Sequence, residues 1–234
     1  MREELAERRE MEIEPGLQII PRVSLKDKAV QSIREAIERG ELQAGETLTE
    51  LGLARKLGVG QPTIREALLE LEFLGFIERQ GPRRTRVTKL TRQAIHDIYQ
   101  VRIRLETLAT EIVVSQKAPD LRDCWNAVLR MEEAAKQGIA TDFYQADLSF
   151  HRALWKQTQN ESLQSCLEQL VPKLMTFSII QKAYPSTVKL GEIAVMHRQL
   201  LEMISVGNIE GATKMMADSM KNALYDDEQL PGLN

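Results

Sequence analysis

The stretch LGVGQPTIREALLELEFLGFIERQGPRRTRVT, residues 57–88, contains the local signals that decide the fold of this chain. Gly58 and Gly60 mark a tight turn, and the residues from Gln61 onward repeat their apolar positions at helical spacing. Pro62 fits the first turn of a helix, because the backbone N–H that proline lacks would have no partner there. The stretch therefore predicts a turn followed by a helix.

Two more helices are predicted upstream of this turn. Ser24 is a plausible cap for an amphipathic helix that stops at Gly40, and Thr49 for a short helix that ends at Gly58. Two short helices separated by GVGQ have the spacing of a helix-turn-helix, whose second helix enters the DNA major groove. The helix that begins near Gln61 is then the one that reads the DNA sequence.

The second half of the stretch predicts a basic hairpin. FIERQ (76–80) and TRVTK (85–89) alternate well enough to form two short strands, and Arg83 and Arg84 fall at the tip between them. Five basic residues fall within eleven positions: Arg79, Arg83, Arg84, Arg86 and Lys89. Duplex DNA carries a negative charge about every 1.7 Å, so such a hairpin suits a phosphate contact. We therefore expect a winged helix-turn-helix domain that binds double-stranded DNA.

The totals limit the class of protein. The chain has 234 residues, a net charge of −3 and 43% hydrophobic positions, which is near the length at which one core gives way to two. Residues 22–89 nevertheless contain 13 basic and 10 acidic residues, so the positive charge is local. Cys124 and Cys166 match no metal-ligand spacing, and no apolar stretch approaches the ~18 residues of a membrane span. We expect a reduced, cytoplasmic protein without a membrane segment.

The sequence predicts a mostly α-helical protein in three parts. A charged N-terminal arm over 1–22 precedes the winged helix-turn-helix domain over 23–90, and an all-α helical bundle follows over 91–228. The bundle has helical periodicity throughout. Its six predicted helices cover 92–116, 119–137, 141–158, 161–184, 187–206 and 209–226.

Several polar residues interrupt the apolar stripes of the bundle. In the first predicted helix Arg102 falls within the stripe Ile95, Ile98, Tyr99, Leu105, Leu108, Ala109 and Ile112. Asp147 and His151 lie one turn apart, and His197 falls on the stripe of another helix. The two histidines and the carboxylate suit a divalent ion, or else they form a hydrogen-bonded core. Arg102 pairs internally with Glu106, or it receives an anion.

Two parts of the sequence resemble known families. AGETLTELGLARKLGVGQPTIREALLELEFLGFIE (44–78) resembles the DNA-binding domain of GntR-family bacterial transcription regulators. DLSFHRALWKQTQNESL (147–163) and MHRQLLEMISVGNIEGA (196–212) resemble the helical FCD domain of the FadR subfamily. The resemblance extends over roughly residues 24–226 and implies the expected two-domain fold.

The resemblance also implies DNA contacts. Arg65 matches an arginine of the family's reader helix and is expected to contact DNA. Gln61 stands where the family often has arginine, so it is expected to read a different base, and glutamine pairs well with adenine. Arg55 and Thr63 are expected to contact phosphates or bases by the same analogy.

The subfamily commonly binds a divalent metal through one aspartate and three histidines. Asp147, His151 and His197 match three of these ligands, but Ser219 stands where the third histidine is expected. Two outcomes remain open: a zinc, nickel or manganese site completed by Ser219, water or effector, or a metal-free pocket in which the histidines bind the effector. Arg102 matches an arginine that is often near the ligand, which favours an organic-acid effector.

The function that follows is a homodimeric, ligand-responsive transcription regulator that binds a palindromic operator. Most members of the family are repressors released by their ligand, so we expect a repressor. The alternatives are a metal-dependent enzyme and a small-molecule sensor that binds DNA without sequence specificity. The sequence has no Ser-His-Asp, Cys-His or phosphate-loop motif, so no catalytic residue is assigned.

Overall fold

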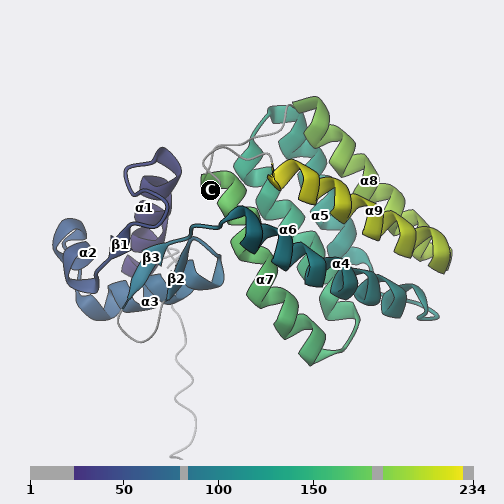
Figure 1. Cartoon of the computed structure of the whole chain (residues 1–234), viewed down its shortest axis with the longest axis horizontal. Helices are drawn as coiled ribbons and strands as arrows, with labels where there is room; N and C mark the ends of the chain where they lie inside the picture. The colour runs from purple at the N-terminus through teal and green to yellow at the C-terminus, as the bar shows by residue number, and fades with distance from the viewer. Residues whose placement is uncertain (1–23, 80–83, 181–186, 229–234) are drawn as a thin grey trace, which may run out of the picture.

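The computed structural model describes residues 24–79, 84–180 and 187–228. The arm predicted over 1–22 lies outside the described residues, and so does Arg83 at the predicted hairpin tip. The described chain forms a small N-terminal part of three helices and a short sheet, and a larger part made of helices alone (Figure 1). This is the mostly α fold that the sequence predicts, with a helix-turn-helix in the N-terminal part and a helical C-terminal part.

The N-terminal part contains every element predicted for it and one more. Its helices are α1 (Leu25–Arg39), α2 (Glu50–Leu57) and α3 (Gln61–Phe73), and its strands are β1 (Thr47–Leu48), β2 (Ile77–Arg79) and β3 (Thr85–Val87). The three strands form an antiparallel sheet in the order β1-β3-β2. β1 was not predicted, because two residues are too short to show a sequence period.

Local signals set the helix ends as the sequence predicts. The Ser24 hydroxyl accepts a hydrogen bond from the Asp27 N–H and the Asp27 carboxylate accepts one from the Ser24 N–H, which is a capping box. Thr49 caps α2 through the Gly52 N–H. Gly58 ends α2 in the left-handed conformation, which a residue without a Cβ adopts at little cost. The turn between α2 and α3 is thereby fixed.

The core of the N-terminal part lies between α1, α3 and the sheet. The side chains of Ile33, Ile37, Ile64, Leu68 and Ile77 are almost completely buried there. Because one face of α3 is committed to this core, its opposite face is left to solvent. α3 can therefore meet another molecule.

The C-terminal part consists of six described helices. These are α4 (Arg92–Val114), α5 (Arg122–Gln137), α6 (Ala140–Gln157), α7 (Glu161–Ile180), α8 (Thr187–Ser205) and α9 (Ile209–Glu228). The prediction was three residues early for the start of α5, and the predicted end of the fourth bundle helix, over 181–184, lies outside the described residues. α4 packs along α9, and α5 packs against α6 and α8 (Figure 1). Among the described helices, none is long and apolar enough to cross a membrane.

The apolar stripe predicted for α4 divides into two faces. Ile95, Tyr99 and Ala109 are buried together with Arg102. Leu108, which the stripe placed inside, is 42% exposed, and Ile98, Leu105 and Ile112 are only half-buried. The prediction was wrong for Leu108, because a stripe of i, i+3 and i+4 positions is wider than the strip that the neighbouring helices cover.

α7 connects the bundle to the N-terminal part. The Thr176 hydroxyl donates a hydrogen bond of 2.7 Å to the carbonyl of Leu74, just beyond α3. Gly75 follows with a φ of 80°, and a Cβ at this position would lie 2.5 Å from the carbonyl carbon of Pro172. Ile180 packs against the N-terminal core. The end of α3 and the middle of α7 lie so close together that only glycine fits at position 75.

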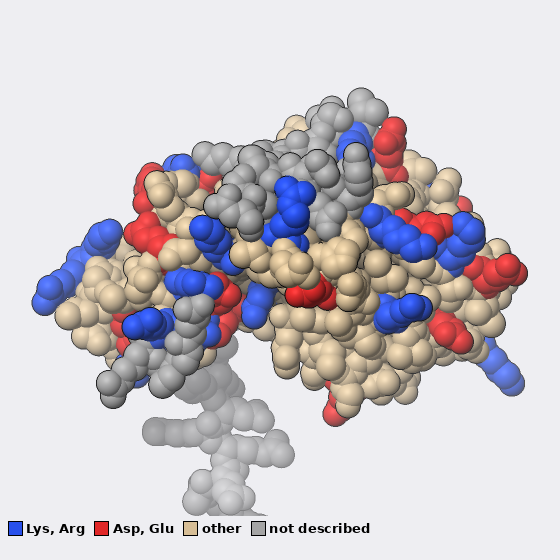
Figure 2. Space-filling view, viewed as in Figure 1, with Lys and Arg blue, Asp and Glu red and all other residues tan. Residues whose placement is uncertain are grey.

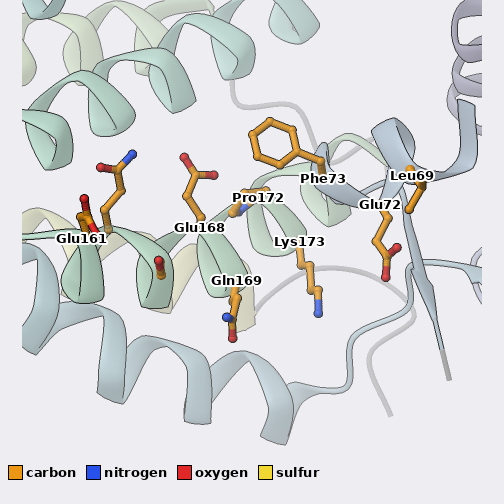
Figure 3. A pocket seen from close by; sticks show the side chains of 10 residues that line it. Leu69, Glu72, Phe73, Glu161, Glu168, Gln169, Pro172 and Lys173 are labelled. Atoms are coloured by element: carbon orange, nitrogen blue, oxygen red, sulfur yellow. The ribbon is translucent and has the colours of Figure 1, made fainter. Parts of the chain in front are cut away.

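A hollow of about 720 Å³ lies beside this junction. Figure 3 shows its lining from both elements, with Leu69, Glu72 and Phe73 on α3 and with Glu161, Glu168, Gln169, Pro172 and Lys173 on α7. The Arg152 guanidinium lies 4.5 Å from the centre of the Phe73 ring and forms a forked ion pair with Glu168. The aromatic end of α3 is thus held by charged side chains of the bundle.

Candidate nucleic-acid interface and candidate metal centre

The first turn of α3 forms an exposed surface. Gln61 and Arg65 are exposed and Thr63 is half-buried, as a reader helix requires. The N-cap residue is Gly60, so no side chain accepts a hydrogen bond from the first N–H groups of α3. An open helix N-terminus favours negatively charged groups, because its N–H groups and dipole point outward. The geometry is suitable for a phosphate beside a base contact.

Arg65 already has a partner within the helix-turn-helix. Its Nη2 lies 2.9 Å and its Nε 3.2 Å from the two carboxylate oxygens of Glu50 on α2. The hydrogen bonds from Arg65 lower the pKa of the Glu50 carboxyl below its usual range. The Arg65 side chain is still 58% exposed, so DNA can compete with Glu50 for the guanidinium.

The other predicted DNA contacts lie on the same small domain. Arg55 on α2 and Arg84 just before β3 are both exposed, while Arg83 lies outside the described residues. The basic cluster is less free than its sequence suggests, because Arg79 and Arg86 each form an ion pair with a glutamate of this domain. Figure 2 shows Lys and Arg side chains together with acidic ones over this part of the molecule.

The bundle contains a cavity of about 880 Å³ between α4, α6, α7, α8 and α9. Its lining includes four ionisable side chains: Arg102 on α4, Asp147 and His151 on α6, and His197 on α8. His151 is 1% exposed and both Arg102 and His197 are 3% exposed, so these groups are almost completely removed from water. Buried ionisable groups need partners or a bound ion, which makes this cavity the candidate site.

The structure brings the three predicted metal ligands together. Nε2 of His197 lies 3.0 Å from Oδ1 of Asp147, and Nε2 of His151 lies 3.6 Å from the same oxygen. One ligand atom from each residue lies within 4.8 Å of the others. Among the described residues this is the one cluster of at least three such groups with this spacing. The i, i+4 spacing of Asp147 and His151 was visible in the sequence, whereas the assignment of His197 to the same site rested mainly on the family resemblance.

Hydrogen bonding orients the His197 ring. Its Nδ1 lies 2.8 Å from the carbonyl oxygen of Ile193, and because a carbonyl only accepts, Nδ1 carries the hydrogen. In the neutral ring, Nε2 then directs a lone pair at Asp147. Asp147 Oδ1 is buried and has no hydrogen-bond donor among the described residues. Two facing lone pairs at 3.0 Å require a cation or a proton between or beside them.

A second carboxylate lies behind His151. Oε1 of Glu106 is 3.1 Å from Nδ1 of His151 and 3.4 Å from Nε of Arg102, and Oε2 accepts a hydrogen bond of 2.8 Å from Trp155 Nε1. Burial favours the neutral acid, but the charges of His151 and Arg102 and the bond from Trp155 outweigh it and lower the Glu106 pKa. The predicted Arg102–Glu106 pair is thus present as part of a larger network.

Asp147 is affected in the same way. Burial alone would raise its pKa, but the adjacent His197, followed by His151 and Arg102, leaves the pKa below the ordinary value. Asp147 is therefore an ionised carboxylate beside two imidazoles. Two imidazole nitrogens and one carboxylate oxygen are a donor set for zinc and similar divalent ions. The residues present fit a metal with an open coordination position.

Ser219 lines the cavity, but its hydroxyl is already used. Its Oγ donates a hydrogen bond of 2.8 Å to the carbonyl of Met216 on the same helix. Sequence reasoning also missed the apolar wall of the cavity. Several methionines of α7, α8 and α9 face it, and the i, i+7 spacing of Met196 and Met203 was a signal for it. Trp155 was missed as the donor that holds Glu106, although it lies one turn from His151.

Comparison with known proteins adds the family. Residues 25–87 match the model for bacterial regulatory proteins of the gntR family, and residues 97–222, more than half of the chain, match the FCD domain. The "Probable D-xylose utilization operon transcriptional repressor" of Paenarthrobacter nicotinovorans is 27% identical over 74% of this chain and 76% of its own length. The "Uncharacterized HTH-type transcriptional regulator YdhC" of Bacillus subtilis is 29% identical over 77% and 80%.

The fold has solved counterparts. The structure of E. coli McbR/YncC superimposes with a TM-score of 0.69, covers 89% of this chain and 99% of its own, and is 21% identical, which shows the fold alone. The chain belongs to the GntR family of bacterial regulatory proteins with a C-terminal FCD domain, and it is a ligand-responsive, DNA-binding transcription regulator and not an enzyme.

Proposed function

We propose that this protein is a homodimeric repressor that binds a palindromic operator and leaves it when a carboxylate effector enters the FCD cavity. The observation that supports this most directly is the buried cluster of Asp147, His151 and His197 beside Arg102 in one cavity. One of the relatives is named a probable D-xylose utilization operon transcriptional repressor, which supports repression as the mode of regulation. The predicted division into an arm over 1–22, a DNA-binding domain over 23–90 and an effector domain over 91–228 fits this proposal.

In this proposal the DNA contacts come from one face of the helix-turn-helix. Arg65 exchanges Glu50 for a base or a phosphate, and Gln61 reads the neighbouring base. Arg55, Thr63, Arg83 and Arg84 contact the backbone. Phosphate contacts fix the position of the reader helix, while Gln61 and Arg65 supply the sequence preference. The regulator acts in the cytoplasm, where the DNA is.

Asp147, His151 and His197 would hold zinc, nickel or manganese. When bound, such an ion supplies a Lewis-acidic position that attracts an effector carboxylate. The Glu106 carboxylate lies 3.1 Å from Nδ1 of His151, and the Ile193 carbonyl orients the His197 ring through Nδ1. Arg102 lies 3.4 Å from His151 Nε2 and contributes a second positive group at the same end of the cavity.

α7 is the proposed route from cavity to DNA. Leu174, Met175 and Ser178 line the cavity, whereas Pro172 and Thr176 of the same helix contact the turn that follows α3. An effector that favours one position of α7 therefore favours one position of α3. The two reader helices of a dimer then keep or lose the spacing that the operator requires.

The dimer is proposed to form through α4. Ile98, Val101, Leu105, Leu108 and Ile112 recur at alternating steps of three and four, the spacing of a helix–helix seam. Val101 and Leu108 are 47% and 42% exposed. Arg104 and Glu111 are exposed and share a heptad position beside this seam, so an antiparallel second copy would place the arginine of one α4 near the glutamate of the other. A two-fold axis produces this arrangement.

The first test is selection of the full-length protein against a random duplex library at physiological salt. Enrichment of a palindrome is expected. Enrichment of a single, non-repeated half-site would contradict the dimer, and the absence of any enriched sequence, with and without added carboxylates, would contradict specific recognition. Elemental analysis of wild type and His151→Ala tests the metal separately. A divalent metal is expected in the wild type alone, and its absence from both would leave a metal-free pocket.

A further inference from the structure

We infer that the effector is an amphipathic monocarboxylate whose apolar body has roughly six or more carbons, and not a small polyhydroxylated acid. The inference rests on the proposed function, because it takes the cavity to be the effector site. It goes beyond that proposal by stating which chemistry fills the space away from Arg102 and the histidines. The argument depends on the size of the cavity, its walls and its mouth.

The cavity is large for a small acid. Its volume of about 880 Å³ lies in the upper part of the ~300–1,000 Å³ range of pockets that bury drug-sized ligands. A carboxylate bound at Arg102, His151 and His197 would occupy only one end. The remainder must hold either water or more of the ligand.

The wall beyond the charged end is mainly apolar. Five methionines line it from three helices, together with aromatic rings such as that of Phe143: Met175 on α7, Met196 and Met203 on α8, and Met215 and Met220 on α9. Methionine side chains are flexible and polarisable, so they adapt to irregular apolar ligands. Releasing water from such a surface favours an apolar body and gives nothing to a hydroxylated one.

The two serine hydroxyls of the wall are already hydrogen-bonded within the protein. Ser178 donates to the carbonyl of Leu174, and Ser219 donates to the carbonyl of Met216. Both bonds stay within one helix, which is the local pairing that serine commonly adopts. Each hydroxyl of a sugar acid that is buried against the methionines of this wall would lack a hydrogen-bond partner, which is costly.

Beyond Arg102 and Asp147, the cavity is lined by two lysines and two carboxylates: Lys189 and Glu192 on α8, and Lys214 and Asp218 on α9. Lys214 and Asp218 on α9 form an ion pair of 2.5 Å with each other and are 76% and 44% exposed. Glu192 is exposed at the same rim. Because Lys214 is largely exposed to solvent, an ion pair between it and a second carboxylate on the ligand would contribute little to binding. One anionic end and one apolar end match the cavity best.

The test is calorimetric titration of the full-length protein, with its metal content measured, using butanoate, hexanoate, octanoate and gluconate. The dissociation constant should fall about fourfold for each added methylene up to octanoate, the factor that burying one methylene contributes. Gluconate should bind more weakly than octanoate. Equal affinity for butanoate and octanoate, or tighter binding of gluconate, overturns the inference while leaving a carboxylate-responsive regulator in place.

Variants locate the apolar body in the cavity. Met196→Gln and Met215→Gln keep side-chain length and alter half-buried positions, so folding is expected to survive. Each substitution should reduce the roughly fourfold fall in the dissociation constant that each added methylene gives in the wild type. Butanoate is too short to reach these positions, so its dissociation constant should change by less than about twofold, which is below the effect of one methylene. Val195→Gln, at a 49% exposed position of α8, is the control and should change nothing. If Met196→Gln and Met215→Gln behave like this control, the ligand body lies elsewhere.

Failure of the inference and failure of the proposed function are distinguishable. If none of the four acids binds, both the inference and the carboxylate effector are overturned, whereas operator selection still decides whether the chain is a specific DNA-binding regulator. Binding of octanoate without release of an operator duplex in fluorescence anisotropy would support the inferred ligand class and contradict the proposed control of DNA binding by the effector.

Discussion

Arg65 is a single side chain with two possible partners. In the described structure it forms a two-pronged ion pair with Glu50, which presents it at the exposed face of α3. An exposed pair of this kind contributes only about 0–1 kcal/mol, so DNA can displace the carboxylate at little cost. Glu50 therefore orients Arg65 without blocking it.

Arg65→Ala tests this contact. The substitution should weaken binding to the selected operator by about 1–3 kcal/mol and relax the preference at one base position, because a side chain that reads a base edge is lost. Anisotropy titration of an operator duplex measures the change. Arg130→Ala, an exposed arginine of α5 with the same loss of charge, is the control. Equal effects of the two substitutions would show that Arg65 acts only through net charge.

Ser219 is the second decisive residue, because it stands where the family places a histidine. Ser219→His should strengthen zinc binding by at least the ~10–100-fold that outer ligand partners typically contribute, since a direct ligand would be added. Competition with a coloured chelator measures the affinity. Lys221→His, two residues further along α9 and exposed, should leave it unchanged. A Ser219→His protein with wild-type affinity would mean that this position does not face the three ligands.

At the scale of elements, α7 is in contact with both functional regions. Its cavity-lining residues alternate with residues that hold the end of α3, because a helix presents successive residues about 100° apart. Gly75 permits this contact, since a Cβ at that position would collide with the backbone of Pro172. α7 is thus the element through which occupancy of the cavity can alter the reader helix.

Thr176→Val removes the hydrogen bond to the Leu74 carbonyl while keeping the shape of the side chain. The free energy of unfolding should fall by about 1 kcal/mol, and the effect of octanoate on operator affinity should shrink, because one of the contacts between α7 and the end of α3 is lost. Urea unfolding and anisotropy measure the two effects. In Thr107→Val, the control, the lost hydroxyl bonds only to its own helix at Ile103. An unchanged effector response in Thr176→Val would exclude this route.

At the scale of the whole molecule, the exposed stripe of α4 is the surface that we assign to the second subunit. Leu108→Glu should convert the dimer to a monomer, because it places a charge in the centre of an apolar seam. Size-exclusion chromatography with light scattering measures the mass. Val195→Glu, at a similarly exposed position of α8, should remain dimeric. A dimeric Leu108→Glu protein would place the subunit contact elsewhere.

The parts of the fold that could be predicted from the sequence are those that depend on neighbouring residues in the chain. Ser24, Thr49, Gly40 and Gly58 act within one turn of the chain, and the helix ends they predict are the ones observed. Leu108 was predicted to be inside, but whether a residue is covered depends on which helices pack beside it. The end of α3 against Pro172 was not predictable either, because it joins positions that are far apart in the chain.

The sequence by itself determined the helix-turn-helix, the hairpin, the helical second part and the residues Asp147, His151, His197 and Arg102 as a polar set, because these follow from spacing within single elements. Only the tertiary structure decided that the set meets in one cavity with Glu106 behind it and methionines around it. The physical reason is that hydrogen bonds, caps and periodicity are local, whereas a shared cavity depends on how helices pack.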